Sequence, residues 1–470
     1  MARKWWTLIA VCTATFMLLL DITIVNVALP AIQRALKASF SDLQWVVDAY
    51  ALALATCVLT AGSLADLFGR KRLFLIGVTL FTIASTACGA ANDPLFLIIA
   101  RGVQGLGGAM MFATALALLS QEFHGKERGT AFGIWGATIG AAVAIGPLAG
   151  GVLTSGLSWR WIFLVNIPIG VVAVALSAKQ LHESSDPEHS RLDPVGLVTL
   201  TGGLLCLILA LIEGNKQGWT NAWILGLLVA AVVLLALFIA SQTADRTTMI
   251  DLQLFKRPAF VGAQVTAFSI SSSMFAMFLY LTLYLQDILG LSPLKTGLVF
   301  LPLSVLSFFA APIAGRLSTR FPIRILLGSG LALNAVALWS MSRVTTASHW
   351  TVLLPGFLVG GVGIGLVNAP LASTAVSTVQ VERAGMASGI NNTFRQLGIA
   401  TGIAALGAIF ASKVDASAFS AHASLAARAS FVHGLHDILL IGATVAACGA
   451  VLATALVRPQ DFVASGPRPS

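Results

Sequence analysis

Long, nearly uninterrupted stretches of apolar residues run through the whole chain and limit the folds open to it. Many reach about 18 residues or more, the length that an α-helix needs to cross a hydrocarbon core roughly 30 Å thick. Of the 470 residues, 57% are hydrophobic and 10% are charged, whereas soluble domains carry about 25% charged residues. A water-soluble fold cannot bury so much apolar surface, so we predict an all-α membrane protein.

The apolar stretches predict fourteen transmembrane helices. We expect them near residues 5–28, 45–65, 73–91, 95–119, 131–153, 161–180, 195–213, 222–241, 260–286, 296–316, 323–342, 350–374, 385–411 and 436–457. Arg3 and Lys4 resemble the start of a signal peptide, but the apolar stretch behind them is too long and leads into further spans. We therefore expect this stretch to remain as the first helix.

The positions of Lys and Arg predict the orientation, because positive residues stay on the cytoplasmic side during insertion. With the N-terminus inside, the inner loops carry 18 of the 28 Lys and Arg residues and the outer loops carry 8. We predict a multi-pass protein of the cell (inner) membrane, surrounded by the lipid bilayer, with both termini in the cytoplasm. The net charge of +9 is scattered through short loops instead of forming a basic stripe, so we expect no nucleic-acid partner.

Three segments of the first part of the chain recur in the second part, and matched glycines are 253 to 256 residues apart. The pairs are Gly62–Arg72 with Gly315–Arg324, Gly102 with Gly356, and Arg128–Gly133 with Arg383–Gly389. The repeat predicts two six-helix halves, 1–181 and 260–457, with two inserted transmembrane helices within 195–241. Duplicated halves are a transporter architecture, and its binding site lies at their interface near the membrane midplane.

Four short motifs follow one another along the first half. They are LDITIVNVALP at Leu20–Pro30, GSLADLFGRKR at Gly62–Arg72, RGVQGLGG at Arg101–Gly108 and GPLAGG at Gly146–Gly151. With these motifs the whole chain resembles the major facilitator superfamily, specifically its fourteen-helix drug/proton antiporter branch. The resemblance implies a major facilitator fold, a small-molecule substrate and protons as the coupling ion. The segment Trp159–Pro168 is also typical of the branch, although the sequence assigns it no role.

The second half departs from this pattern at two positions. Thr319 stands where Asp66 would recur, and Pro355 stands where Arg101 would recur. Function in these two motifs is therefore expected to depend on the first half.

Asp21 lies inside the first helix, where a charged side chain costs roughly 2.5 to 3.5 kcal/mol and usually has a function. A rise of about 1.5 Å per residue places Asp21 about 12 Å and Arg101 about 10 Å from the outer ends of their helices, so the two can meet. Burial favours the neutral acid and an ion pair favours the carboxylate, so a cavity that alternately wets and dries can load and release a proton. We predict that Asp21 binds proton and substrate and that Arg101 modulates it; a fixed pair that only joins two helices is the alternative.

Further polar residues are candidates for the same cavity. They are Asn26 and Gln104, which lie in the motifs of the first and fourth helices, and Asn391, Asn392 and Arg395, which share a face of the thirteenth helix by their spacing. The predicted cavity has one deep carboxylate, Asp21, and two deep arginines, Arg101 and Arg395. This charge balance does not indicate a dicationic substrate, so neutral and anionic substrates both stay possible.

The loop that follows the second helix is expected to act as a gate. Gly62 and Gly69 permit a close approach and a tight turn. Asp66 can accept hydrogen bonds from helix N-termini, and Arg70 and Arg72 can bind the opposite half, so these contacts bias which side is open. The resemblance implies this role, and a charge cluster that only sets the topology is the alternative.

The fifth helix carries a stripe of small residues that includes Gly146, Gly150 and Gly151. Pro147 removes one backbone donor, so the segment can both pack tightly and bend. The resemblance implies that this segment bends and seals the transporter, and plain packing is the alternative.

The sequence does not indicate an enzyme. All seven histidines fall in loops or at helix ends, and no His or Cys pair has metal-ligand spacing within a span. The glycine run Gly360–Gly365 follows no strand, so it is not a nucleotide loop. We predict a protein that is not an enzyme, binds no metal or cofactor, and draws its energy from an ion gradient.

The predicted function is proton-coupled export of small amphipathic organic compounds, such as antibiotics, drugs and dyes, by alternating access. Two alternatives stay open: a narrow exporter or facilitator of one endogenous metabolite or lipid, and a transport-dead membrane sensor or scaffold. The sequence leaves the oligomeric state open.

Overall fold

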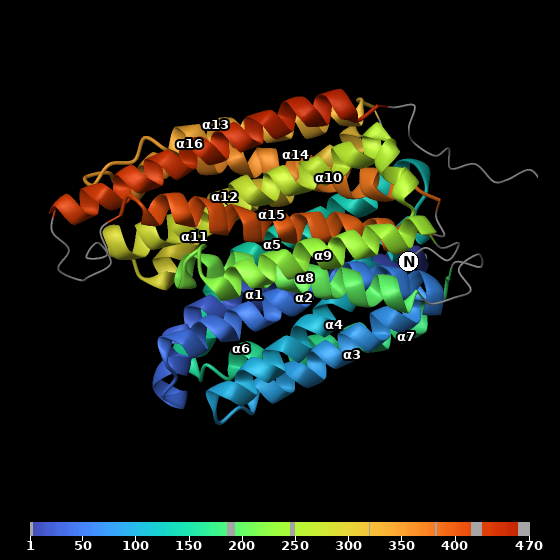
Figure 1. Cartoon of the computed structure of the whole chain (residues 1–470), viewed down its shortest axis with the longest axis horizontal. Coiled ribbons are helices and arrows are strands. Elements are labelled where there is room, and N and C mark those ends of the chain that lie inside the picture. Colours follow the sequence, from blue (N-terminus) through green and yellow to red (C-terminus); the bar gives the residue numbers. More distant parts are fainter. Residues whose placement is uncertain are drawn as a thin grey trace, which may run out of the picture.

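The computed structural model describes residues 3–185, 193–244, 250–318, 320–380, 383–414 and 425–458. Regular structure within these ranges is helical throughout. Thirteen helical segments are long and apolar enough to cross a membrane, and α5 (Gly125–Gly156) adds another long helix where the sequence predicts one. The prediction of an all-α membrane protein is confirmed (Figure 1).

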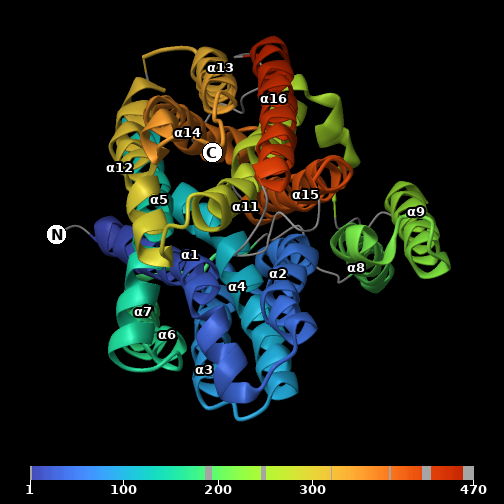
Figure 2. The same cartoon turned by 90° about the vertical axis from the view of Figure 1, so that its left-hand side faces the viewer.

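The helices form two bundles and a separate pair (Figure 2). The first bundle contains α1 (Arg3–Leu36), α2 (Phe40–Phe68), α3 (Arg70–Gly89), α4 (Pro94–Glu122), α5, α6 (Trp161–Leu164) and α7 (Asn166–Gln180). The second contains α10 (Pro258–Ile270), α11 (Ala276–Leu283), α12 (Pro293–Leu317), α13 (Ile323–Met341), α14 (Leu354–Ser377), α15 (Ala384–Ala411) and α16 (Leu425–Leu456). The pair consists of α8 (Pro194–Gln217) and α9 (Ala222–Ala244).

Short polar signals set the helix starts. Ser39 caps α2 in a capping box with Asp42, and Asp93 accepts from the Phe96 backbone amide ahead of Pro94 at the start of α4. Ser292 caps α12 in the same way, again followed by a proline. These caps satisfy backbone donors that would otherwise lack a partner at the helix end.

Several helices are longer than the sequence predicts, and the first and the last differ most. The first helix, expected to end near residue 28, continues to Leu36 and stops where Lys37 adopts a left-handed backbone with φ 51°. The last helix, expected to start at 436, begins at Leu425. Hydropathy detects only the part of a helix inside the hydrocarbon, so it misses turns that continue into more polar surroundings.

One predicted helix, 260–286, is interrupted. Two π-helical turns, Ser271–Phe275 and Tyr284–Ile288, flank α11. The first lies against α15, where a Cβ on Gly402 would approach the Ser272 carbonyl oxygen to 2.5 Å. Two short 3-10 segments, Leu252–Lys256 and Trp350–Leu353, precede α10 and α14.

The α8–α9 pair lies at the side of the molecule where α2 faces α15, and α9 is the outer member (Figure 2). Helix α8 contacts both bundles. The Thr201 hydroxyl lies 2.8 Å from that of Thr60 on α2, and the Asn215 amide donates to the Ala404 carbonyl on α15 over 2.8 Å. The inserted pair is therefore attached to both bundles through α8.

Candidate functional site

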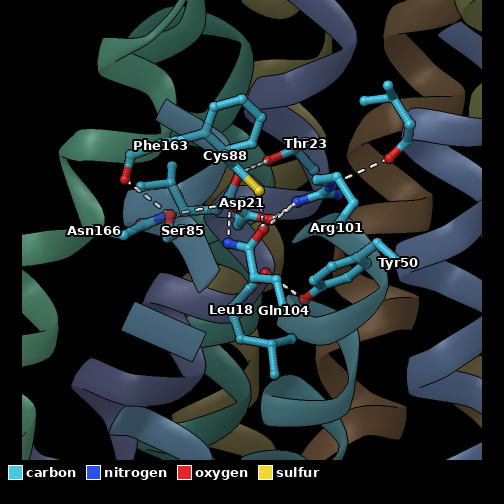
Figure 3. A network of polar contacts seen from close by, with 12 residues as sticks. Leu18, Asp21, Thr23, Tyr50, Ser85, Cys88, Arg101, Gln104, Phe163 and Asn166 are labelled. Carbon is cyan, nitrogen blue, oxygen red and sulfur yellow. Dashed lines mark hydrogen bonds and ion pairs between the residues drawn. The ribbon is translucent and has the colours of Figure 1, made fainter. Parts of the chain in front are cut away.

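Asp21 is fully buried in the first bundle and is surrounded by hydrogen-bond donors (Figure 3). Its Oδ2 atom forms an ion pair with Arg101 Nη1 from α4. Its Oδ1 atom accepts from Gln104 Nε2 over 2.8 Å and from Asn166 Nδ2 over 3.0 Å. Helices α1, α4 and α7 thus meet at one carboxylate.

Arg101 is held by groups on three sides of its guanidinium. Its Nε donates to the Val46 carbonyl over 3.1 Å, and its Nη1 also donates to Gln104 Oε1 over 2.8 Å. The Tyr50 ring lies against the cation, with 4.2 Å between the ring centre and Arg101 Cζ. The side chain is only 1% exposed, so its position is fixed by these contacts.

Asn166 is the functional candidate that the sequence alone did not identify. It lies in Trp159–Pro168, at the start of α7 and directly after the break between α6 and α7 at Val165. Its Nδ2 also donates to Ser85 Oγ over 3.0 Å, and Ser85 donates to the Phe163 carbonyl over 2.9 Å. The available sequence signal was a polar residue, Asn166, within the segment Trp159–Pro168 that is typical of the branch. The structure shows that its partner is Asp21.

Hydrogen-bond donors from two helices, α4 and α7, converge on the carboxylate of Asp21. Arg101, Gln104 and Asn166 all present donors to Asp21, and a carboxylate accepts from all of them.

A second polar centre joins the two bundles at the end that holds Arg3, the predicted cytoplasmic end. Asp66 on α2 accepts from the backbone amides of Gly385 over 3.1 Å and Met386 over 2.7 Å, so it caps the N-terminus of α15. Arg70 binds the same carboxylate, with 2.9 Å from Nε to Oδ1. Both side chains are nearly fully buried.

The turn after α2 has the geometry expected of glycine. Gly69 has φ 107°, which a residue with a side chain rarely adopts. Glu183 caps the following helix by accepting from the backbone amides of Lys71 and Arg72. The Arg72 side chain is 76% exposed and faces Glu183 in its own bundle, so this contact differs from the expected one with the opposite half.

Glycines bring the bundles into backbone contact at the same end. A Cβ on Gly62 would lie 2.5 Å from the carbonyl oxygen of Gly385, and one on Gly315 would lie 2.0 Å from that of Gly129. Gly315 is the repeat partner of Gly62, and Gly129 lies in the repeat of the segment that holds Gly385. The internal repeat therefore produces two similar contacts, α2 with α15 and α5 with α12.

The glycines of α5 face two neighbours. A Cβ on Gly146 or Gly150 would meet Thr23 or Ile24 of α1, while Gly151 lies toward Leu294 of α12. The backbone of α5 is one helix from Gly125 to Gly156. The side chains of two candidates, Pro147 in α5 and Asn26 in α1, lie outside the described residues.

The remaining cavity candidates lie on α15 but bind different partners. Asn391 donates to Gln264 of α10 over 3.2 Å, and Asn392 donates to the Phe112 carbonyl of α4 over 3.3 Å. Arg395 donates to Asn368 Oδ1 of α14 over 2.9 Å. The structure thus does not bring them to Asp21.

Replacing Asn166 by Ala is expected to lower about tenfold the export that the sequence predicts. The change removes one hydrogen bond to a charged group, which contributes about 1.5 to 3 kcal/mol. Efflux of a fluorescent dye, measured at equal protein levels, checks this. As a control, Thr86→Ala removes an exposed hydroxyl that bonds within its own helix and is expected to leave export unchanged; equal losses in the two variants would contradict a role of Asn166.

Sequence comparison identifies the family. A profile of the Major Facilitator Superfamily matches residues 11–403. The chain belongs to the Major Facilitator Superfamily. It is therefore a multi-pass membrane transporter and not an enzyme, as predicted.

Several curated relatives within this superfamily have names that refer to resistance. The multidrug resistance protein Stp of Mycobacterium tuberculosis (strain CDC 1551 / Oshkosh) is 38% identical, over 87% of this chain and 76% of that protein. The tetracenomycin C resistance and export protein of Streptomyces glaucescens is 34% identical, over 88% of this chain and 77% of that protein. The puromycin resistance protein pur8 of Streptomyces alboniger is 35% identical, over 98% and 93%.

Solved structures support the same superfamily fold. The human organic anion transporter MFSD10 matches with a TM-score of 0.67 at 12% identity, over 96% of this chain and 100% of that chain. The proton:xylose symporter XylE matches with a TM-score of 0.68 at 13% identity, over 97% of this chain and 96% of that chain. The predicted major facilitator fold is confirmed, since both structures extend over nearly the whole chain.

Proposed function

We propose that this transporter is a proton-coupled antiporter that exports small amphipathic organic compounds, such as antibiotics, drugs and dyes. The observation that carries the proposal is the fully buried carboxylate of Asp21. Arg101 neutralises it, and the side-chain amides of Gln104 and Asn166 donate hydrogen bonds to it. Such a buried acid in a membrane helix is usually functional. The resistance proteins among the relatives support export as the direction.

Proton and substrate use Asp21 in turn. While Asp21 is ionised it holds Arg101, and when it takes up a proton it gives up that ion pair. Substrate binding near Asp21 favours one form of the acid over the other, so outward substrate movement is linked to inward proton movement. Arg101 sets the balance between the ionised and the protonated form of Asp21, because it is the direct counter-ion of that carboxylate.

Alternating access follows from movement of the halves 1–181 and 260–457 against each other, with the inserted helices within 195–241 at their side. The contacts of Asp66 with α15 and of Gly315 with α5 close the cytoplasmic end. Opening that end breaks both contacts, so Gly62, Asp66, Gly69, Arg70 and Arg72 act as a gate. The segment Gly146–Gly151 of α5 bends and seals against α1 as the halves move.

The protein acts in the cell (inner) membrane with both termini in the cytoplasm. This orientation follows from the excess of Lys and Arg in the loops at the end that holds Arg3 and Arg70.

The test uses purified protein in proteoliposomes with an imposed pH gradient and a pH dye inside. Adding a panel of antibiotics and dyes is expected to make at least one compound draw protons through the wild-type protein. A compound that moves at the same rate with and without the gradient would instead favour a facilitator of one metabolite or lipid. Binding without any flux would favour a transport-dead sensor or scaffold.

A further inference from the structure

The second bundle holds a buried cation that has no counter-ion among the residues that the structure describes. Arg395 on α15 is 7% exposed, and its one hydrogen-bond partner among the described residues is the neutral Asn368 side chain. Asp21, Asp66 and Glu213 are the buried acids in the part of the chain that the structure describes, and none of them lies in α10–α16. A guanidinium has five N–H donors, so most of those on Arg395 are available.

Two buried polar side chains that face α5 have atoms with no hydrogen-bond partner among the described residues. The Asn368 carboxamide accepts from Arg395 through Oδ1, while its Nδ2 atom is buried and has no hydrogen-bond partner. Ser307 on α12 likewise has a buried hydroxyl without a partner. Both residues lie against α5: a Cβ on Gly136 would come 3.7 Å from Asn368 Cβ, and one on Gly140 would come 3.4 Å from Ser307 Oγ. Buried polar atoms normally find partners, so their absence indicates a place for a ligand's acceptor atoms.

The position of these groups gives a cargo access to them. Arg395 lies about 16 Å along α15 from its start at Ala384, close to the middle of the membrane. One turn earlier, Asn392 contacts the Phe112 carbonyl of the first bundle. Arg395 and Asn368 therefore lie where the two bundles meet, and they become accessible from the cytoplasm when the bundles separate at that end.

We propose that Arg395 binds an anionic group of the cargo, such as a carboxylate or an ionised phenol, with Asn368 and Ser307 donating further hydrogen bonds. This inference rests on the proposed export function and assigns it a substrate class: amphipathic aromatic anions and their neutral, acceptor-rich analogues. The planar fork of the guanidinium matches a carboxylate through two parallel hydrogen bonds. The deep arginine of the first bundle, Arg101, is already neutralised by Asp21.

The test compares two probes of equal shape, 2-naphthoate and the uncharged 2-naphthamide. Equilibrium binding of each labelled probe is measured on the purified full-length protein in detergent. We expect the wild-type protein to bind the carboxylate at least about tenfold more tightly than the amide, and Arg395→Gln to remove that preference. Arg395→Lys keeps the positive charge but lacks the planar guanidinium, and we expect it to retain part of the preference for the carboxylate.

Two further variants control the measurement. Arg324→Gln removes an exposed arginine at the start of α13 and is expected to leave the preference unchanged. If Arg395→Gln fails to fold, Asn368→Ala decides, because it removes the residue that orients the guanidinium and is expected to reduce the preference about threefold or more. The inference is overturned if the wild-type protein shows no preference for the carboxylate, or if the preference survives both Arg395→Gln and Asn368→Ala.

These binding data do not depend on proton coupling. Loss of the preference in Arg395→Gln, together with no drug-driven proton flux in wild-type proteoliposomes, would leave the anion site standing and remove the antiporter proposal. Normal drug-driven proton flux in wild-type proteoliposomes, together with an unchanged carboxylate preference in Arg395→Gln, would remove the anion site and leave the antiporter proposal standing.

Discussion

Asp21→Asn is expected to reduce drug-driven proton movement in proteoliposomes to the level of protein-free liposomes. Asparagine keeps the shape of aspartate and can still contact Gln104 and Asn166, but it can neither bind a proton nor carry a charge. The substitution therefore removes the exchange step and leaves the packing of α1 in place. Proton entry, recorded with an interior pH dye while drugs are added, measures the effect.

The same variant leaves Arg101 buried without a counter-ion, which costs about 3 to 5 kcal/mol of stability. A double variant, Asp21→Asn with Arg101→Gln, separates this cost from the loss of function. Because it removes both charges, we expect it to recover thermal stability and still to move no protons. Full coupling in the double variant would place the proton site elsewhere in the protein.

Gly315→Ala is expected to hold the cytoplasmic end open. Its Cβ would lie 2.0 Å from the Gly129 carbonyl oxygen, and backbone atoms on both sides cannot move apart while the bundles stay closed. Val376 of α14 packs with first-bundle residues in the closed structure, so a cysteine there reports the opening. Labelling of Val376→Cys by a membrane-impermeant maleimide from the cytoplasmic side should rise at least about tenfold, in a protein whose native cysteines are replaced.

Two comparisons sharpen this measurement. Gly62→Ala acts at the other backbone contact, where the added Cβ would lie 2.5 Å from the Gly385 carbonyl, and should raise labelling in the same direction. Gly226→Ala on α9 adds a Cβ with no heavy atom within 4 Å and should change nothing. Unchanged labelling in both Gly62→Ala and Gly315→Ala would show that these glycines do not keep the end closed.

Much of this architecture could be predicted because the membrane restricts it strongly. Every span must satisfy its own backbone in hydrocarbon, so long apolar stretches translate directly into helices. The pairing of Asp21 with Arg101 was predictable as well, since a deep acid requires a partner and the depth of each residue follows from its helix position. The repeat of Gly62 as Gly315 corresponds to two similar backbone contacts between the bundles.

Other parts of the site depend on contacts that no local pattern encodes. Asn166 reaches Asp21 because α7 packs against α1, and that packing has no hydropathy signature. The sequence predicted that Asp66 accepts hydrogen bonds from a helix N-terminus but did not identify α15 as that helix, and it did not predict that Arg72 would lie beside Glu183 of its own bundle. Such contacts depend on how helices are placed side by side, which spacing along one helix cannot supply.

The most direct test of exchange at Asp21 is proton release on drug binding to the purified protein. The protein is placed in detergent with a weak buffer and a pH dye, and a drug that it exports is added. Exchange predicts that wild-type protein releases protons as the drug binds and that Asp21→Asn binds the drug and releases none. Equal proton release from both proteins, or drug binding to wild type without any release, would contradict exchange of proton and substrate at Asp21.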